Sequence, residues 1–403
     1  MKDLLSAREA AALLDVKPAT LYSYVSRGLL TSAPGAHGPS RLYARPDVER
    51  LRARHVARSG HGAVAAGALR FGEPVLESAL TAIDEHGPRY RGHDAVELAD
   101  GGASFESVAE LLWSGAFRKK VATFPSVARL PELGRFVPRG APPIAVLSLV
   151  VPSVALGDPW RFNAPLAEEL ARARRLVRIL ASGVAFAFDA RRARASLASP
   201  TVAGALALAL GVAATPKTRA ALDRALVLSA DHELNPSSFA ARVAASTGAD
   251  LYACVEAALG ALSGPEHGGA TERIEALVTE IGTPARAATV LEERTRRGDA
   301  LPGFGHPLYP AGDPRAVPLL RAVSGRRRAE RTLAALVTRM KAARRAPPNV
   351  DLGLVATALS LGLPPGSASA IFAVGRAAGW IAHVLEQRGA AFVLRPRARY
   401  VGP

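Results

Sequence analysis

Long stretches rich in alanine, leucine and valine run through the chain, and they limit its fold more than any other feature. Residues 201–214 and 219–228 are apolar around the whole helical turn, which is typical of helices packed on more than one side. Apolar residues make up 49% of the chain but aromatic residues only 5%, so small aliphatic side chains must fill the core. Alanine and leucine favour helices. Because no stretch alternates apolar and polar residues long enough to indicate a sheet, we predict an all-α fold.

A length of 403 residues is enough for two or three domains, and residues 1–58 are predicted to form a separate small one. Ser6 and Glu9 have the spacing of a capping box at the start of a short helix. Pro18 fits the first turn of a second helix, which Gly28 would end. Two short helices about a tight turn form a helix-turn-helix.

The second helix of such a module can enter the major groove of DNA, and residues 35–45 would form a wing beside it. With this pattern, residues 6–51 resemble the winged helix-turn-helix of the MerR type or its excisionase-like relatives. The alternative is a helical module used only for dimerisation or docking. The candidate DNA-contacting residues are the polar side chains of this helix and wing: Lys17, Thr20, Tyr22, Ser23, Arg27 and Arg41.

The formal charge of +16 favours anionic partners, either nucleic acid or a phosphorylated or carboxylated ligand. A GC-rich genome, which enriches arginine and alanine everywhere, is an alternative explanation of the same excess. Cys254 is the only cysteine, so neither an internal disulfide nor a cysteine-based metal site is expected. The N-terminus lacks the apolar core of a signal peptide, and prolines interrupt the apolar run at 142–156. We expect a soluble, cytoplasmic protein without a membrane span.

Three histidines between residues 229 and 315 stand in three different settings. His232 lies in the segment SADHELN, His267 in GPEHGG and His306 in PGFGHPLY. Glycine lets the backbone come close to a ligand, so the two glycine-flanked histidines are presented to something rather than packed under something. With the DPR segment that ends at Arg315, they indicate a site for a polar, anionic small molecule.

Further motifs follow these histidines: PNVD ending at Asp351, GRAAGWIAH with Arg376, and LRPRARY with Arg395. The whole set, in this order, resembles the citrate synthase family. The match covers about residues 71–403, and its specific motifs all lie after residue 228. A helix-turn-helix fused ahead of such a body also resembles a known branch of the family.

The resemblance implies a Claisen-type condensation. An acyl-CoA loses a proton from the carbon next to its thioester, the enol attacks the ketone of oxaloacetate, and water then cleaves the thioester. Asp351 matches the catalytic base of the family. His267 matches the residue that donates to the thioester oxygen, and His306 matches the one that polarises the ketone and protonates the alkoxide. The acyl-CoA is a cosubstrate, and no cofactor is implied.

The oxaloacetate and citrate binders of the family are matched by four residues: His232, Arg315, Arg376 and Arg395. Arginine suits this role because its planar fork can hold a carboxylate with two hydrogen bonds. In the family the arginine matching Arg395 comes from the neighbouring subunit, so the resemblance implies a homodimer. Arg397 and Arg399 are alternatives for that match. Four other residues of the motifs are interpreted as structural: Asn235, Arg242, Trp380 and His383.

The same resemblance predicts a linker over 59–70, a large domain of residues 71–269 and 363–403, and a small domain of residues 270–362. Asp351 has an alternative interpretation, as the N-cap of a helix that starts at Leu352.

The chain also departs from the family pattern. It has PLYP at 307–310, where the family often has Arg-Val-Tyr-Lys near the coenzyme A site, and PSS at 236–238 in place of Ala-Ser-Thr. These changes leave the acyl chain open: acetyl-CoA giving citrate, or propionyl-CoA giving 2-methylcitrate. A different class of function is also open, in which the synthase body senses a metabolite and controls the helix-turn-helix.

Overall fold

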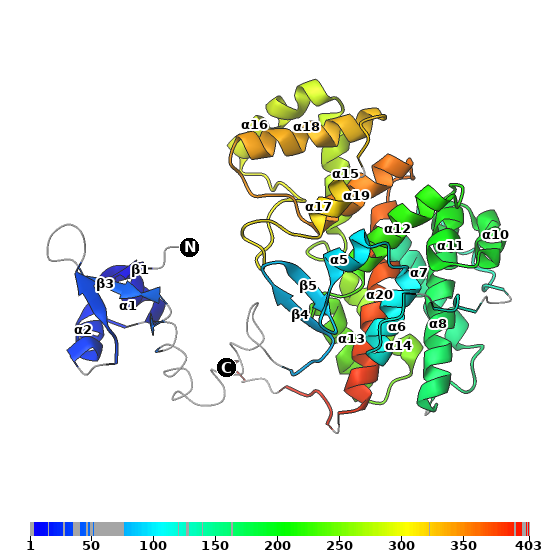
Figure 1. Cartoon of the computed structure of the whole chain (residues 1–403), viewed down its shortest axis with the longest axis horizontal. Coiled ribbons are helices and arrows are strands. Elements are labelled where there is room, and N and C mark those ends of the chain that lie inside the picture. Colours follow the sequence, from blue (N-terminus) through cyan, green and yellow to red (C-terminus); the bar gives the residue numbers. More distant parts are fainter. Residues whose placement is uncertain are drawn as a thin grey trace. The chain divides into compact units, whose positions relative to one another are not determined.

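The chain divides into two units in the computed structural model: Met1–Glu77 with Pro396–Pro403, and Ser78–Arg395 (Figure 1). The structure describes residues 4–14, 16–26, 29–34, 41–45, 47–48, 51, 76–119, 121–125, 129–138, 140–162, 164–321, 323–390, 392–396, 400 and 402.

The first unit is a winged helix-turn-helix, as predicted. Its described elements are β1 (Leu4–Ser6), α1 (Ala7–Leu14), α2 (Pro18–Ser26), β2 (Ser32–Pro34) and β3 (Arg41–Ala44). The capping box is confirmed, because the carboxylate of Glu9 accepts from Ser6 N at 2.8 Å and Ser6 Oγ accepts from Glu9 N at 3.3 Å. Strand β3 pairs antiparallel with β1 and with β2, which forms the wing. Leu21 and Tyr43 are fully buried in its core.

The second unit is mostly helical, which confirms the predicted fold class. Its helices are α5 (Ala95–Asp100), α6 (Phe105–Ser114), α7 (Pro143–Ala155), α8 (Leu166–Gly183), α9 (Ala185–Phe188), α10 (Ala193–Ala198), α11 (Val202–Ala209), α12 (Pro216–Ser229), α13 (Pro236–Ser246), α14 (Leu251–Leu262), α15 (Ala270–Ile281), α16 (Ala287–Arg297), α17 (Ala316–Leu320), α18 (Arg328–Ala342), α19 (Val350–Leu361) and α20 (Ser367–Arg388), with short 3-10 helices at Ala190–Arg192 and Pro284–Arg286.

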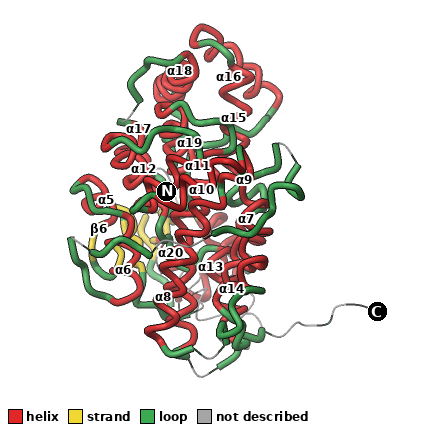
Figure 2. The backbone as a smooth tube through the Cα atoms, turned by 90° about the vertical axis from the view of Figure 1, so that its right-hand side faces the viewer, coloured by secondary structure: helices red, strands yellow, loops and turns green. Residues whose placement is uncertain are grey.

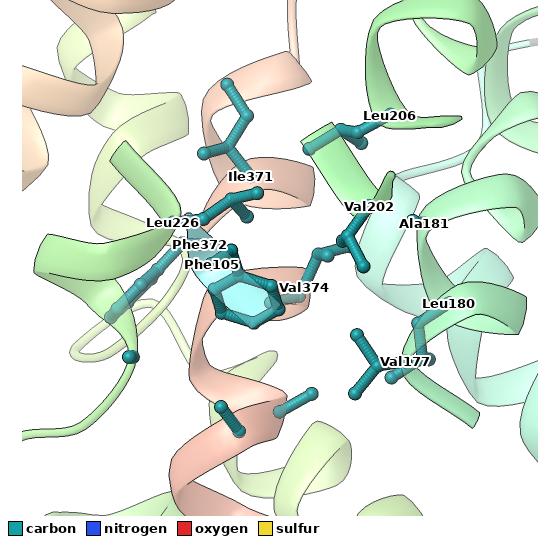
Figure 3. Packing of buried hydrophobic residues seen from close by; sticks show 14 of the residues in the cluster. Phe105, Val177, Leu180, Ala181, Val202, Leu206, Leu226, Ile371, Phe372 and Val374 are labelled. Atoms are coloured by element: carbon teal, nitrogen blue, oxygen red, sulfur yellow. The ribbon is translucent and has the colours of Figure 1, made fainter. Parts of the chain in front are cut away.

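Helix α20 forms the centre of this unit and packs against α6, α12, α13, α14 and α19. Its residues Ile371 and Val374 lie among Phe105, Val202 and Leu226 from other helices (Figure 3). Burying such a side chain stabilises the fold by about 1.5–3 kcal/mol. Among the described helices, α20 is the one that is long and apolar enough to cross a membrane. However, 94% of its most apolar 18-residue stretch is buried inside the protein. It is therefore the core helix of a packed unit.

A second, smaller core lies at one end of this unit, where α15, α16 and α18 meet (Figure 2). It is built from aliphatic side chains of these helices: Leu277, Ile281, Ala287, Val290, Leu291, Leu336 and Met340. These residues fall inside the range predicted for the small domain. The boundaries at 270 and 362 stay a prediction.

A small antiparallel sheet in the second unit escaped the sequence analysis. It consists of β4 (Thr81–Asp84), β5 (Gly87–Tyr90) and β6 (His93–Asp94) in that order. Strands of two to four residues are too short for alternation to be visible. The sheet matters for the site, because the Tyr90 hydroxyl donates to the Val227 carbonyl at 2.9 Å, near the end of α12.

Candidate active site

His306 lies on a loop that is tied to the segment leading into α19. Gly305 N donates to Pro347 O at 2.7 Å, and Asn349 N donates to Gly303 O at 2.9 Å. Gly303 and Gly305 have φ values of +89° and +80°, which favour glycine. This pairing holds the His306 loop against the start of α19.

Asp351 occupies the first turn of α19. Asn349 caps this helix, since its side chain accepts from Leu352 N at 3.3 Å. Asp351 is therefore not the N-cap, and its carboxyl group is not used for capping. Burial raises the pKa of Asp351 to about 6, although Arg315 opposes the rise. Such a carboxylate is ionised at neutral pH but is a stronger base than an ordinary aspartate.

Asp313 joins Arg315 to the start of α19. Its two carboxylate oxygens accept from Arg315 Nε at 2.9 Å and Arg315 Nη2 at 2.8 Å, and Oδ2 also accepts from Val350 N at 2.9 Å. Arg315 is 2% exposed. One edge of its guanidinium is thus committed to Asp313, so a ligand must approach the other edge. The sequence analysis quoted Asp313 in the DPR segment but gave it no role.

The tautomer of His306 follows from its own loop. Its Nδ1 accepts from Leu308 N at 3.1 Å, which leaves the ring proton on Nε2. Burial lowers the pKa of His306 to about 4, and the charge of Arg315 adds to the effect. His306 is therefore a neutral hydrogen-bond donor at neutral pH.

His232 stands next to His306 and meets a tyrosine that the sequence analysis missed. The two histidine rings lie edge to face with centroids 5.2 Å apart. His232 Nε2 is 3.0 Å from the hydroxyl of Tyr309, whose ring lies 4.9 Å from that of His306. Burial first, and then the charge of Arg315, lowers the pKa of His232 well below its usual range. The only signal for Tyr309 was its position three residues after His306.

Arg376 is a buried cation without a carboxylate partner among the described residues. It is 2% exposed, and its Nε donates to Ser229 O at 2.7 Å. Its guanidinium lies 4.8 Å from the ring centroid of Phe372, one helical turn earlier on α20. Burial lowers the pKa of Arg376 to about 10, so it stays charged at neutral pH. Burying an unpaired charge is costly, which favours an anionic ligand at this position.

His267 is held through a serine by residues that we interpreted as structural. Its Nε2 lies 2.9 Å from Ser237 Oγ. That hydroxyl accepts from Trp380 Nε1 at 3.0 Å and lies 2.7 Å from Asn235 Oδ1. Burial lowers the pKa of His267 to about 4, so this ring is also neutral. Asn235 and Trp380 therefore position the serine that contacts a candidate catalytic histidine.

The Ser237 hydroxyl has one proton and two acceptors for it. When it donates to Asn235 Oδ1, His267 must carry its proton on Nε2 and Nδ1 is only an acceptor. When it donates to His267 Nε2, the proton of the ring lies on Nδ1, which can then donate to a ligand. A role of His267 as a donor requires the second arrangement.

The structure brings six of the seven residues predicted for catalysis and substrate binding into one cluster. The charges of Arg315 and Arg376 act on both His232 and Asp351. The charge of Arg315 also acts on His306, and that of Arg376 acts on His267. Arg395 is not part of this cluster: it is exposed on the tail after α20 and forms no hydrogen bond or ion pair within the described part of the chain. Its alternatives, Arg397 and Arg399, lie outside the described residues.

In the first unit, α2 presents a polar face opposite the buried Leu21 and Tyr24. The predicted DNA-contacting residues Lys17, Tyr22, Ser23 and Arg41 are exposed, and Thr20 is half-buried. Arg41 also donates to Ser32 Oγ at 2.8 Å across the wing. Arg27 lies outside the described residues. As for metals, the described residues contain no group of histidine, cysteine, aspartate or glutamate that could hold an ion.

Comparison with known proteins gives both units a relative. Residues 70–397 match the family model described as citrate synthase, C-terminal domain, and residues 4–56 match a helix-turn-helix domain. A 2-methylcitrate synthase of Mycobacterium tuberculosis is 32% identical over 78% of this chain and 84% of its own. The citrate synthase of Haloferax volcanii is 32% identical over 81% of this chain and 93% of its own. Citrate synthase 2 of Bacillus subtilis is 40% identical, but the match spans only 45% of this chain and 51% of its own.

Solved structures have the same fold. The citrate synthase of Thermoplasma acidophilum aligns with a TM-score of 0.70 and 26% identity, over 84% of this chain and 96% of its own. That protein was solved with carboxymethyl coenzyme A and oxaloacetate. The citrate synthase of Thermotoga maritima aligns with a TM-score of 0.67 and 28% identity, over 82% of this chain and 94% of its own.

Proposed function

We propose that this chain, which belongs to the citrate synthase family and is an enzyme of that type, condenses acetyl-CoA with oxaloacetate and water to give citrate and CoA. The observation that carries the proposal is the unpaired, buried Arg376 beside three neutral histidines and the raised-pKa carboxyl of Asp351. This arrangement suits a dianionic ketone and a weak carbon acid. Because the relatives include both citrate and 2-methylcitrate synthases, propionyl-CoA is the alternative acyl donor.

In the first step Asp351 takes a proton from the acyl carbon next to the thioester. So weak a carbon acid loses its proton only if the developing enolate is stabilised at once. His267 donates from Nδ1 to the thioester oxygen, with Ser237 donating in turn to its Nε2. A neutral ring avoids charge separation before the proton moves, and its low pKa keeps it neutral.

In the second step the enol carbon attacks the ketone carbon of oxaloacetate. Arg315 and Arg376 hold the two carboxylates, and His232 orients the ketone side of the molecule. The Nε2–H of His306 polarises the ketone and passes its proton to the new alkoxide. Donors aimed at charge that appears in the transition state supply a large part of catalysis. Water then cleaves the thioester, which releases CoA. We call His232, His306, Arg315 and Arg376 the oxaloacetate cluster.

For the coenzyme A part of the substrate, the chain offers a basic segment at the end of α18 and just after it, which consists of Lys341, Arg344 and Arg345. All three side chains are exposed. Arg344 has a φ of +50°, which is uncommon for a residue with a side chain. The segment leads into the residues that are tied to the His306 loop. We propose that it takes the phosphates of coenzyme A, where the PLYP sequence lacks basic residues.

The protein acts as a cytoplasmic homodimer in this proposal. Exposed apolar residues support a second copy as the partner: Leu149, Leu156, Trp160 and Phe162. Two of them lie on a loop that is fixed by Arg172, which donates to Asp158 at 2.7 Å and to the Trp160 carbonyl at 2.8 Å. Exposed apolar side chains on a fixed loop suit a permanent interface. Arg395, which contacts nothing in its own chain's cluster, would complete the site of the partner.

Mixing two inactive variants tests the dimer. Asp351→Asn lacks the base, and Arg395→Ala lacks the residue that would cross to the partner. A hybrid dimer would contain one site with both groups intact, so mixing after partial unfolding and refolding should recover activity that neither variant has alone. If the mixture stays inactive while both variants form dimers, Arg395 does not serve the neighbouring site.

The reaction itself is tested by competition between acyl donors. Equal concentrations of acetyl-CoA and propionyl-CoA are mixed with oxaloacetate and the full chain, and the products are identified by mass spectrometry. Citrate in excess would establish the proposed reaction. An excess of 2-methylcitrate would establish the alternative, and the absence of both products would overturn the proposal. A single methylene discriminates by only about 1–3 kcal/mol, so both products are expected in unequal amounts.

The first unit supports a second function, which is binding to DNA. Three exposed residues and the matched helix-turn-helix domain favour it: Lys17, just before α2, and Tyr22 and Ser23 on α2. Mobility shifts on genomic DNA fragments should show binding that weakens steeply with salt. Lys17→Ala should weaken it, whereas Arg191→Ala, which removes an exposed arginine from the other unit, should not. If the two variants retard the DNA equally, the assignment of DNA binding to this surface is refuted. Repeating the shifts with oxaloacetate tests the metabolite-sensing alternative.

A further inference from the structure

Asp231 and His383 are a buried acid and a buried histidine next to the oxaloacetate cluster, and no step of the proposed reaction uses them. Asp231 precedes His232 in the chain, and His383 lies on α20. Both side chains are 0% exposed, and His383 Nε2 is 3.3 Å from Asp231 Oδ1. The other oxygen of Asp231 accepts from the hydroxyl of Thr81, on β4, at 2.6 Å. The carboxylate thus has a hydrogen bond from Thr81 on one side and the His383 ring at ion-pair distance on the other.

Arg242 fixes His383 in the orientation that serves this contact. Its Nε donates to His383 Nδ1 at 3.0 Å. Because a guanidinium can only donate, His383 must keep its proton on Nε2, the nitrogen that lies beside Asp231. Arg242 is itself paired with Glu386 and donates to Gln387 at 3.3 Å, both in the last turn of α20. The histidine therefore has one tautomer and little freedom to turn.

Asp231 is also the anion that acts most strongly on Arg376. Burial lowers the pKa of Arg376, and the charge of Asp231 is the largest effect that opposes it. The two side chains nevertheless form no ion pair within the described part of the chain. Arg376 donates instead to Ser229 O, two residues before Asp231. A buried cation and a buried anion are thus close neighbours that are kept from direct contact.

A glycine makes room for this arrangement. A Cβ atom at Gly379 would clash with Oδ1 of Asp231 and with the Ala230 carbonyl, which accepts from Gly379 N at 2.9 Å. Gly379 lies on α20 between Arg376 and His383. The carboxylate therefore occupies a notch on α20 that directs it toward His383 and away from Arg376.

We propose that His383 and Thr81 are positioning residues that clamp the Asp231 carboxylate away from Arg376 and so keep its guanidinium free for a carboxylate of oxaloacetate. The inference rests on the proposed function, because Arg376 is assigned to oxaloacetate there. Without the clamp, Asp231 would swing toward the unpaired cation, since a direct pair relieves the cost of burying both charges. The anion of the protein would then compete with the anion of the substrate.

Three variants test the clamp: His383→Leu, Asp231→Asn, and the two combined. Removing the histidine donor should raise the Kd and KM for oxaloacetate about tenfold, within the range of coupling energies between contacting groups. The KM for acyl-CoA should change less than twofold. Adding Asp231→Asn should restore oxaloacetate affinity, because the released side chain then no longer carries a competing charge. His383→Gln, which keeps an N–H donor, should stay close to the wild type.

The rescue by Asp231→Asn decides the question, because a merely structural defect would grow with a second substitution. A double variant that binds oxaloacetate more weakly than His383→Leu would overturn the clamp. If His383→Leu does not fold, Thr81→Val removes the other half of the clamp and is tested in the same way. Calorimetric titration with oxaloacetate needs no turnover. A wild type that binds oxaloacetate without forming product would refute the proposed reaction, while the clamp is still judged from the binding data.

Discussion

The oxaloacetate cluster and the basic segment differ in how the fold holds them. Arg315 and Arg376 are each 2% exposed, and each donates to a fixed partner: Arg315 to Asp313 and Arg376 to the Ser229 carbonyl. Arg344 and Arg345, by contrast, are exposed just after the end of α18. A buried cation affects folding as well as binding, so its partners must be present in the free protein. An exposed cation contributes little to folding, so its main effect is on the ligand that it contacts. We expect substitutions in the basic segment to affect folding less than substitutions in the oxaloacetate cluster.

The largest effect is expected from the proposed base, which starts the reaction by deprotonating the acyl-CoA. Asp351→Asn should lower kcat by about 10²–10⁴, the usual contribution of a general base. The asparagine keeps the shape of the side chain and leaves Asn349 as the helix cap. Oxaloacetate binding, measured by calorimetry, should stay within about threefold of the wild type. A kcat within twofold of the wild type would exclude Asp351 as the base.

The buried half of the comparison is tested through Asp313. Asp313→Ala leaves Arg315 buried without its partner, which should lower the free energy of unfolding by about 3–5 kcal/mol. Urea unfolding followed by tryptophan fluorescence reports on this unit, because Trp113, Trp160 and Trp380 all lie in it. The matched control is Asp299→Ala, which removes an exposed partner of Arg297 and should change the same quantity by less than about 1 kcal/mol. Equal effects of the two substitutions would remove the distinction between buried and exposed pairs.

The pH dependence separates the base from the histidines. The pKa of Asp351 is raised to about 6, so its basic form is lost as the pH falls through that value. The pKa values of His267 and His306 are lowered to about 4, so both rings stay neutral over the same range. We expect kcat/KM to fall about tenfold per pH unit below pH 6 and to be flat up to pH 8. Activity that holds constant down to pH 5 would contradict the assignment of Asp351.

The smallest effect is expected from substitutions in the exposed basic segment. Replacing Arg344 and Arg345 together by alanine should raise the KM for acyl-CoA about three- to tenfold at low salt, and the difference should shrink as salt screens the charges. The KM for oxaloacetate and the free energy of unfolding should not change. The control is a double alanine variant of Arg296 and Arg326, which are not in this segment. An equal rise in KM for the control would mean that overall charge, not the segment, attracts the acyl-CoA.

Local patterns in the sequence predicted much of the fold. The capping box at Ser6 and the helix that begins at Pro18 are each indicated by a few consecutive residues. The small sheet was missed because its strands are only two to four residues long. A secondary-structure element can thus be predicted when a few consecutive residues mark where it begins or ends.

The residues of the candidate site could be predicted from the sequence, but the contacts that position them could not. Motif order placed His267, His306 and Asp351 in one site. The contacts that hold them join residues far apart in the chain, such as Trp380 with Ser237, which are 143 positions apart. His383 and Trp380 were interpreted as structural because no local pattern shows what a buried side chain meets. The role predicted for Arg395 involves a second copy of the chain, and it stays a prediction.

Thiol release tests the central claim, that this chain is a condensing enzyme, most directly. The purified protein is mixed with acetyl-CoA or propionyl-CoA, with and without oxaloacetate, and free CoA is followed with a thiol reagent. The account predicts release that requires oxaloacetate and is lost in Asp351→Asn. Release that is independent of oxaloacetate, or no release from the folded protein with either acyl-CoA, would contradict it. The proposal that the first unit binds DNA would then be examined next.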